Sequence, residues 1–333
     1  MPHLFCLLLA ACVAAPAFAQ YEESITVQRM LLEVRVTKYG GEPVTGLAPA
    51  DFKVRIGGQP VDVASAIWQD EGKSGEPCAD GRNCLPTPGR LVVVFIQTDF
   101  TRQNLRVTRQ MNFRRYAEQI VNAFAAEDRI AVVSFDSHLK FRCDLTTDRE
   151  AAITAMRRAI LIDAPTPPPA VPEPSLAPLL DAKKLKDAVN AEQALLLVGE
   201  ALRRIDGPKT LLLIGWGLGD HLRGVFHTKP AWKPARRALV DGRVNVIAVD
   251  TGFGGQLSEG LRVAATQTGG FYSSAAELPQ VVVNRVQKTL RGRYELELIA
   301  PVPIAPGVYD VVVSVMRGAA VVLAPDSITI SKE

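Results

Sequence analysis

The first part of the chain carries a pattern with a period of two. Between residues 26 and 69, apolar and polar positions alternate in short stretches such as "LLEVRV" and "KVRI". Glycine pairs at 40–41 and 57–58 separate these stretches. Alternation of this kind is typical of strands with one buried face, and paired glycines favour tight turns between them. The pattern predicts an N-terminal β segment over residues 20–69.

From residue 90 the apolar positions become continuous and form runs of six. Such runs are typical of strands that are buried on both faces. Between them lie segments with helical spacing. This alternation predicts an α/β domain over residues 90–291, with a doubly wound, mostly parallel sheet and right-handed crossovers. The apolar runs are 91–96, 130–135, 210–215 and 244–249, and the helical segments are 105–128, 148–161, 181–206 and 233–242.

Two further segments complete the domain organisation. The proline-rich stretch 163–178 can be neither a helix nor a central strand, so it predicts an exposed, extended loop between two helices. The pattern of strands returns in a C-terminal β segment over residues 292–333. We expect the two β segments to pair in one β-rich module into which the α/β domain is inserted.

The N-terminus predicts export. An apolar stretch ends at Ala17-Phe18-Ala19, which matches a signal peptide over residues 1–19. Leu9-Ala10-Ala11-Cys12 offers an alternative, a bacterial lipobox with a lipid anchor on Cys12. In both cases the expected location is the periplasm or the extracellular space. No later stretch has about 18 continuous apolar residues, so we expect no membrane span in the mature chain.

The net charge gives no sign of a nucleic-acid partner. With 38 basic and 35 acidic residues the net charge is only +3, too small to indicate a nucleic-acid partner.

The spacing of two cysteines predicts a disulfide. Cys78 and Cys84 flank five residues in a linker over residues 70–89. An oxidising compartment would favour a small disulfide ring between them. Cys143 is left over, and we expect it to be a buried thiol.

A resemblance to a known family adds to this picture. The stretch "EVRVTKYGGEPVTGLAPADFKVRIGGQPVDV" is followed in order by "DRIAVVSF", "GRVNVIAVDTG" and "GVYDVVVSV". Together they resemble the bacterial VWFA-related domain family over about residues 26–320. The resemblance implies a von Willebrand factor A-like fold. Members of that fold bind a divalent cation through D-x-S-x-S after the first strand, a Thr in a second loop and an Asp after the fourth strand.

That resemblance implies a degenerate metal site in this chain. Gln97 stands where the first Asp of D-x-S-x-S should be, and Trp216 falls near the position of the fourth-strand Asp. Mg²⁺ and Mn²⁺ prefer oxygen ligands with carboxylate charge, so we expect no bound cofactor. The alternative is a rearranged Mg²⁺ or Mn²⁺ site, in which Asp99 and Thr101 replace the two Ser positions and Thr146 supplies the second loop.

The sequence offers no support for catalysis. It contains no G-x-S-x-G elbow, and Asp136, Ser137 and His138 would alternate between two faces of a strand end. We therefore expect a non-catalytic module that binds a protein partner or serves in adhesion. The alternative is a cation-dependent adhesion or sensor protein. Aromatic side chains favour interfaces, and the candidate partner contacts are Trp216, Asp220, Trp232 and Phe253.

Overall fold

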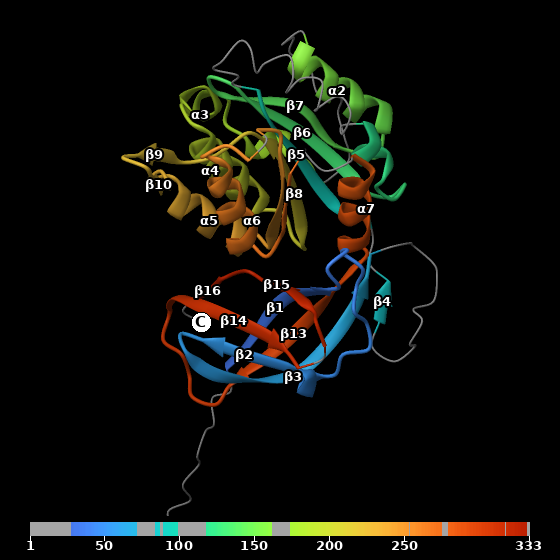
Figure 1. The fold of residues 1–333 in the computed structure, drawn as a ribbon, viewed down its shortest axis with the longest axis vertical. Coiled ribbons are helices and arrows are strands. Elements are labelled where there is room, and N and C mark those ends of the chain that lie inside the picture. The colour runs from blue at the N-terminus through green and yellow to red at the C-terminus, as the bar shows by residue number, and fades with distance from the viewer. Residues whose placement is uncertain are drawn as a thin grey trace, which may run out of the picture.

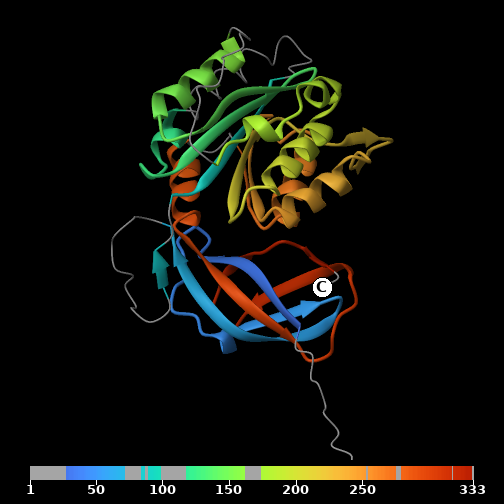
Figure 2. The same cartoon turned by 180° about the vertical axis from the view of Figure 1, so that it is seen from behind.

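The computed structural model describes residues 28–71, 84–86, 89–98, 118–161, 174–252, 254–274, 279–316 and 318–331. Figure 1 shows two parts, an α/β unit above and a β-rich module below, and Figure 2 shows the same arrangement from behind. Within the described residues, no helix is both long enough and apolar enough to cross a membrane.

The α/β unit is built on a six-stranded sheet in the order β12-β11-β8-β5-β6-β7. All neighbouring strands run parallel except β7, which is antiparallel to β6. The strand order reverses at β5, so the carboxyl ends of β5 and β8 flank the crevice where doubly wound sheets bind ligands. The strands are β5 (Leu91–Gln97), β6 (Arg129–Phe135), β7 (Leu139–Thr146), β8 (Lys209–Gly215), β11 (Val244–Asp250) and β12 (Tyr272–Ser274).

Helices cover both faces of this sheet. Alternate residues of β5 point to opposite sides, so Val92 and Val94 belong to one apolar core while Val93 and Phe95 belong to the other. All four have 0% exposure, which confirms that the continuous apolar runs are doubly buried strands. Residues 118–122 are helical, and the other helices are α2 (Arg149–Leu161), α3 (Ala182–Asp187), α4 (Ala191–Leu202), α5 (Trp232–Asp241), α6 (Ser258–Gln267) and α7 (Pro279–Thr289).

Two predicted helices are wrong in their extent, and one of them, the segment 105–128, leaves helical geometry after residue 122. The segment 181–206 forms two helices, because the chain leaves helical geometry at Ala188 and begins again after Asn190. The Asn190 side chain accepts a hydrogen bond from the backbone nitrogen of Gln193 at 2.9 Å, which is the geometry of an N-cap. Alanine and asparagine at the break are only weak signals for the end of a helix. Because the residues on both sides have helical spacing, the sequence predicted one continuous helix.

The β-rich module is an eight-stranded sheet in the order β15-β1-β13-β3-β2-β14-β16, with β4 paired to β3. Strand β13 lies between β1 and β3, so segments from both ends of the chain share one sheet. Gly57 and Gly58, with φ of 57° and 80°, form the predicted hairpin turn. The strands are β1 (Gln28–Thr37), β2 (Phe52–Ile56), β3 (Gln59–Asp70), β4 (Cys84–Pro86), β13 (Gly292–Ala300), β14 (Gly307–Val315), β15 (Val321–Leu323) and β16 (Ser327–Ile330).

Ion pairs join the two parts at their boundary. Arg243, between α5 and β11, contacts the carboxylates of Glu33 on β1 and Glu295 on β13. Arg236 on α5 lies 3.1 Å from Asp326 near β16. The module therefore contacts the amino-terminal edge of the α/β sheet, where β11 begins.

Candidate functional site

The side-chain amide of Gln97 links two central strands at the carboxyl edge. Gln97 ends β5 and is 4% exposed. Its Oε1 accepts hydrogen bonds from the backbone nitrogens of Trp216 at 3.1 Å and Gly217 at 3.3 Å. A Cβ on Gly215 would lie only 2.6 Å from that oxygen, so the residue there must be glycine for the amide to fit. The amide thus bridges the crevice between β5 and β8.

Backbone contacts extend this link to β11. Thr251, which follows β11, donates to the carbonyl oxygen of Gly215 from its backbone nitrogen at 2.7 Å and from its Oγ1 at 3.0 Å. The backbone nitrogen of Leu218 donates to Leu257 O at 3.2 Å. The ends of β5, β8 and β11 are therefore held together by one hydrogen-bonded set of loops.

Asp250 is a buried carboxylate at the same edge that the sequence reasoning missed. It ends β11, has 0% exposure and accepts four hydrogen bonds, from Gly252 N, Gly254 N, Ser258 Oγ and Tyr272 Oη at 2.6, 3.1, 2.6 and 2.7 Å. Several donors of this kind stabilise a buried negative charge. Burial, followed by the bond to Asp250, raises the pKa of Tyr272 to about 12. The signal was present in the sequence as an acid directly after an apolar run.

Glu192 is a second buried carboxylate that was missed. It lies in the first turn of α4, is 2% exposed and accepts a hydrogen bond from the backbone nitrogen of Gly219. Gly219 has φ +83°, a left-handed conformation that favours glycine. Glu192 therefore fixes the loop after β8 from the side of the helix layer. Helical spacing alone marked it as an ordinary helix residue.

The structure contradicts the placement of Thr146 in a metal site. On β6, Thr146 pairs with Ile130, whereas Gln97 pairs with Phe135, five residues further along the strand. At about 3.3 Å per residue the two lie about 17 Å apart, at opposite edges of the sheet. The cause is that β7 runs antiparallel. Thr146 Oγ1 instead accepts a hydrogen bond from the backbone nitrogen of Asp148, just before α2.

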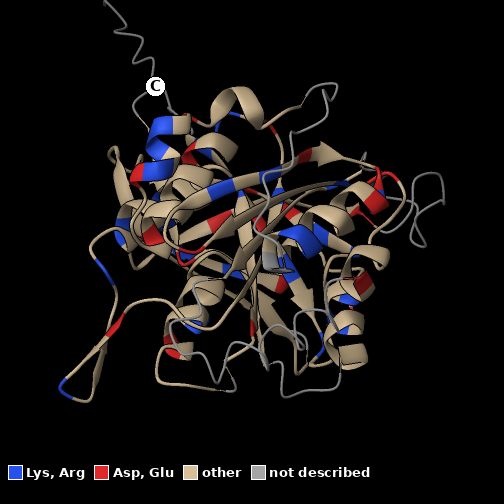
Figure 3. Cartoon of the chain, turned by 90° about the horizontal axis from the view of Figure 1, so that it is seen from above, with Lys and Arg blue, Asp and Glu red and all other residues tan. Residues whose placement is uncertain are grey.

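The other expected ligands cannot be placed. Asp99 and Thr101 lie outside the described residues. Within the residues that are described, no group of three or more His, Cys, Asp or Glu side chains could hold a metal ion. Figure 3, seen from above, shows the Lys and Arg positions interspersed with the Asp and Glu positions along the described elements of the chain.

The proposed partner contacts lie in different environments. Trp216 is half-buried, and Asp220 is exposed and lies 3.6 Å from Lys229 Nζ. Trp232 is only 5% exposed and donates from Nε1 to Gln267 Oε1 at 2.8 Å. Its assignment to a contact surface is therefore corrected, because the indole belongs to the core beneath α5 and α6. Phe253 lies outside the described residues.

Asp220 belongs to a hairpin that the sequence analysis did not predict. Strands β9 (Asp220–Leu222) and β10 (Val225–His227) form a separate two-stranded sheet. It projects from the side of the α/β unit in Figure 1. Leu222 and Val225 pair across the turn and are 60% and 57% exposed.

The Asp136-Ser137-His138 stretch forms a turn between β6 and β7. Although adjacent residues of a strand end were expected to alternate between two faces, the side chains contact one another in this turn: Ser137 Oγ lies 3.0 Å from His138 Nδ1 and 3.1 Å from Asp136 Oδ1. The Asp136 carboxylate also accepts from Lys140 Nζ at 2.6 Å. Burial favours its neutral form, but the hydrogen bonds from Lys140 and Ser137 outweigh burial and lower the pKa of Asp136 to about 2. The carboxylate contacts the serine and lysine rather than the far nitrogen of the imidazole, so the order of a Ser-His-Asp relay is not formed.

The structure describes the side chain of only one of the cysteines named in the sequence analysis, Cys143. Cys143 on β7 is a free thiol, 2% exposed. Burial, and then the charges of Asp144 and Asp148, raise the pKa of this thiol to about 11. Cys78, the Cys84 side chain, Cys12 and the cleavage site at Ala19 lie outside what the structure describes.

Comparisons with solved structures find similar chains at low sequence identity. A von Willebrand factor type A protein from Catenulispora acidiphila is 10% identical with a TM-score of 0.44, and the match covers 91% of this chain and 74% of that one. Proximal thread matrix protein 1 from the mussel byssus is 14% identical with a TM-score of 0.41, covering 61% and 48%. An aerotolerance-related membrane protein from Bacteroides fragilis is 15% identical with a TM-score of 0.39, covering 61% and 96%. No protein-family model and no curated protein matches the sequence.

Proposed function

We propose that this chain is an exported VWFA-related protein whose α/β unit is a non-catalytic protein-binding or adhesion module. In this proposal the carboxyl edge of the sheet, between β5 and β8, contacts the partner without a metal ion. The observation that carries the proposal is the Gln97 amide, whose oxygen accepts hydrogen bonds from Trp216 and Gly217.

The electrostatics of the edge support recognition without a cation. A divalent cation needs carboxylate charge to offset the loss of its water shell. At the position where the family resemblance implies an Asp, the edge carries the neutral amide of Gln97. The nearby carboxylates of Asp250 and Glu192 already accept hydrogen bonds from the loops. Among the described residues of the edge, these carboxylates hold the loops in place, which supports recognition without a cation.

Exposed apolar groups beside the edge support a protein partner. Leu222 and Val225 are more than half exposed on the β9–β10 hairpin, and Trp216 is half-buried at the base of the same loop. Exposed apolar groups that gather on one projecting element favour a contact with another protein.

The proposal also covers location and chemistry. The sequence of residues 1–19 supports export to the periplasm or the extracellular space. The arrangement of Asp136, Ser137 and His138 gives no relay, which supports a function without catalysis. No resident cofactor is part of the proposal.

A capture experiment tests the proposal. The mature chain is immobilised and exposed to an envelope fraction with and without EDTA, and the bound proteins are identified by mass spectrometry. We expect the same partner with and without EDTA, and a loss of that partner with Trp216→Ala. Tyr39→Ala is the matched control, because Tyr39 is an aromatic residue that is 90% exposed on the β-rich module. Equal recovery by both variants, or recovery that requires Mg²⁺, would contradict the proposal.

A further inference from the structure

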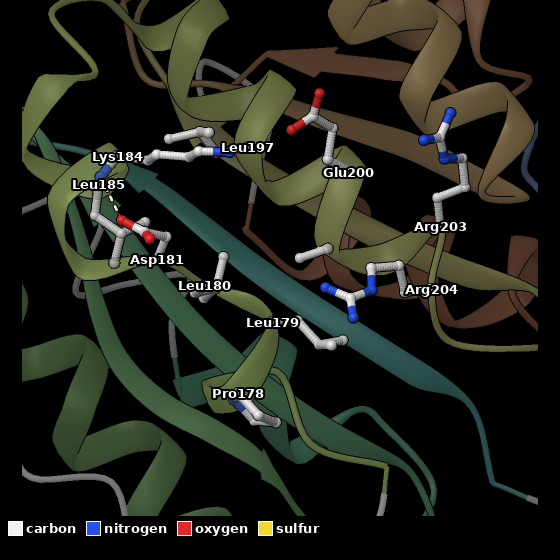
Figure 4. A pocket seen from close by; sticks show the side chains of 11 residues that line it. Pro178, Leu179, Leu180, Asp181, Lys184, Leu185, Leu197, Glu200, Arg203 and Arg204 are labelled. Atoms are coloured by element: carbon white, nitrogen blue, oxygen red, sulfur yellow. Dashed lines mark hydrogen bonds between the residues drawn. The ribbon is translucent and has the colours of Figure 1, made fainter.

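A hollow lies beside helix α4 of the α/β unit. A groove of about 520 Å³ separates the segment that contains η2 (Ala177–Leu179) and α3 from helix α4. Figure 4 shows the side chains that line it, with Arg204 directed across the groove from the α4 side and Arg203 directed away from it. The volume lies within the range of small-ligand and peptide pockets.

The floor of the groove is apolar. Leu179, Leu180, Leu185 and Leu197 are all half-buried. One side of each packs against the core between the sheet and α4, while each also lines the groove. Covering apolar surface of this kind contributes about 25 cal/mol for each Å² removed from water. An apolar side chain of a ligand would therefore be favoured at this position.

The wall formed by residues 175–185 is held in place from within the protein. Asp144 on β7 is 1% exposed, and its Oδ1 accepts from the backbone nitrogen of Leu176 at 2.8 Å. Its other oxygen accepts from Ser175 Oγ. At the next turn, Asp181 accepts from the backbone nitrogens of Lys183 and Lys184, each at 2.9 Å. A wall that is ordered in advance lowers the entropy lost on binding.

The rim of the groove carries more basic than acidic groups. Lys184 stands on the α3 wall and Arg204 on the α4 side, and neither has an ion-pair partner among the described carboxylates. Arg203 lies 3.9 Å from Asp241, outside the groove. The Asp181 carboxylate keeps its negative charge while it caps α3, because the backbone hydrogen bonds of the cap, and then the charge of Lys184, lower its pKa. The three basic groups of the lining, Lys184, Arg203 and Arg204, outnumber the acidic groups Asp181 and Glu200, so the lining carries a net charge of +1.

From this geometry we propose that the groove binds an extended, acidic segment of a partner protein. Leucine-like side chains of the segment lie on the leucine floor, and flanking aspartates or glutamates pair with Lys184 and Arg204. The lining combines leucines with charged groups, which suits a peptide better than a hydrocarbon chain. The groove ends near Arg204, on the approach to the amino end of β8, so it is distinct from the edge at Gln97.

The test is a fluorescence anisotropy titration of the mature chain with two labelled peptides of equal length. One alternates aspartate with leucine, and the other alternates lysine with leucine. We expect saturable binding of the acidic peptide only. The double variant K184E/R204E should weaken that binding about tenfold, because two rim contacts change from attraction to repulsion.

The matched control is K183E/K186E, which changes the net charge equally at two exposed α3 positions outside the groove lining. We expect it to lose clearly less binding of the acidic peptide than K184E/R204E does, because Lys183 and Lys186 do not line the groove and do not contact the bound segment. Leu197→Ala should weaken binding while leaving the circular dichroism spectrum unchanged. Trp216→Ala should leave peptide binding unchanged. A failure of the groove proposal can therefore be distinguished from a failure of the proposed function at the carboxyl edge.

Four outcomes would overturn the inference. They are no binding of the acidic peptide, equal binding of the lysine peptide, an equal loss with K183E/K186E, and binding of vesicles of anionic lipid that competes with the peptide and depends on the same two residues.

Discussion

The side-chain oxygen of Gln97 lies 3.1 Å from the backbone nitrogen of Trp216 and accepts its hydrogen bond. The contact joins residues from the two central strands at the point where the sheet reverses its order. In the site that the family resemblance implies, this position would carry a charged ligand of a cation. Here a neutral amide holds two loops together, and the proposed mode of recognition depends on that contact.

Replacing this amide by an apolar group should destabilise the fold. In Gln97→Leu the backbone nitrogens of Trp216 and Gly217 lose their acceptor while they remain largely buried. We expect the free energy of unfolding to fall by about 1–3 kcal/mol, measured by urea denaturation. The control is Gln59→Leu at an exposed position of β3, which should change it by no more than about 0.5 kcal/mol. Equal stability of the two variants would show that the amide bonds contribute nothing.

Asp144 should contribute strongly to the stability of the fold, because its carboxylate holds the segment that begins at Ser175. Asp144→Ala removes the acceptor for Leu176 N and Ser175 Oγ, and we expect a loss of about 2–4 kcal/mol in the free energy of unfolding. Hydrogen exchange at the Leu176 amide should become faster. In Asp148→Ala, which removes only an exposed bond to Ala151 N, the loss should be about 1 kcal/mol. Unchanged exchange at Leu176 would contradict this account of the groove wall.

Tyr272 should make stability depend on pH in the alkaline range. Its pKa is raised from 10.0 to about 12 in the folded chain, so the folded state retains the phenol proton more strongly than the unfolded state. The contribution is fully present below pH 10 and is lost as the pH rises toward 12. Thermal melts across this window should show a steeper decline for the unmodified chain than for Tyr272→Phe. If the melting temperatures of the two chains fell equally with pH, the pKa of Tyr272 would not be raised in the folded state.

Cys143 should be unreactive while the chain is folded. Its thiol is 2% exposed and has a pKa of about 11, so little thiolate forms near neutral pH. Iodoacetamide should leave Cys143 unmodified in the native chain and label it in urea, as read by peptide mass mapping. Rapid labelling of the folded chain, absent in Cys143→Ser, would contradict the buried assignment.

The central strands could be predicted because burial on both faces leaves an apolar run, as in residues 91–96 of β5 and 246–249 of β11. The β9–β10 hairpin could not, because its three-residue strands carry Asp and His and have no apolar period. Thr146 was misplaced for a different reason. The order of motifs along a chain does not reveal that β7 runs antiparallel, and this direction decides which edge of the sheet Thr146 reaches.

The candidate site was predicted in its position but not in its contacts. The polar break after the apolar run marked Gln97 correctly as the end of a strand at the carboxyl edge of the sheet. The pairing of its side chain with Trp216 depends on the path of a loop more than a hundred residues away. Asp250 and Glu192 could not be assigned to the edge from the sequence, because the backbone groups that donate to them come from loops whose paths the sequence does not reveal.

Isothermal titration of the mature chain with Mg²⁺ and with Mn²⁺ tests the central claim most directly. If Gln97 closes the edge as a neutral amide, neither cation should give saturable heat, and Asp99→Ala should titrate like the unmodified chain. Saturable heat that Asp99→Ala abolishes would show a working metal site and would contradict recognition without a cation.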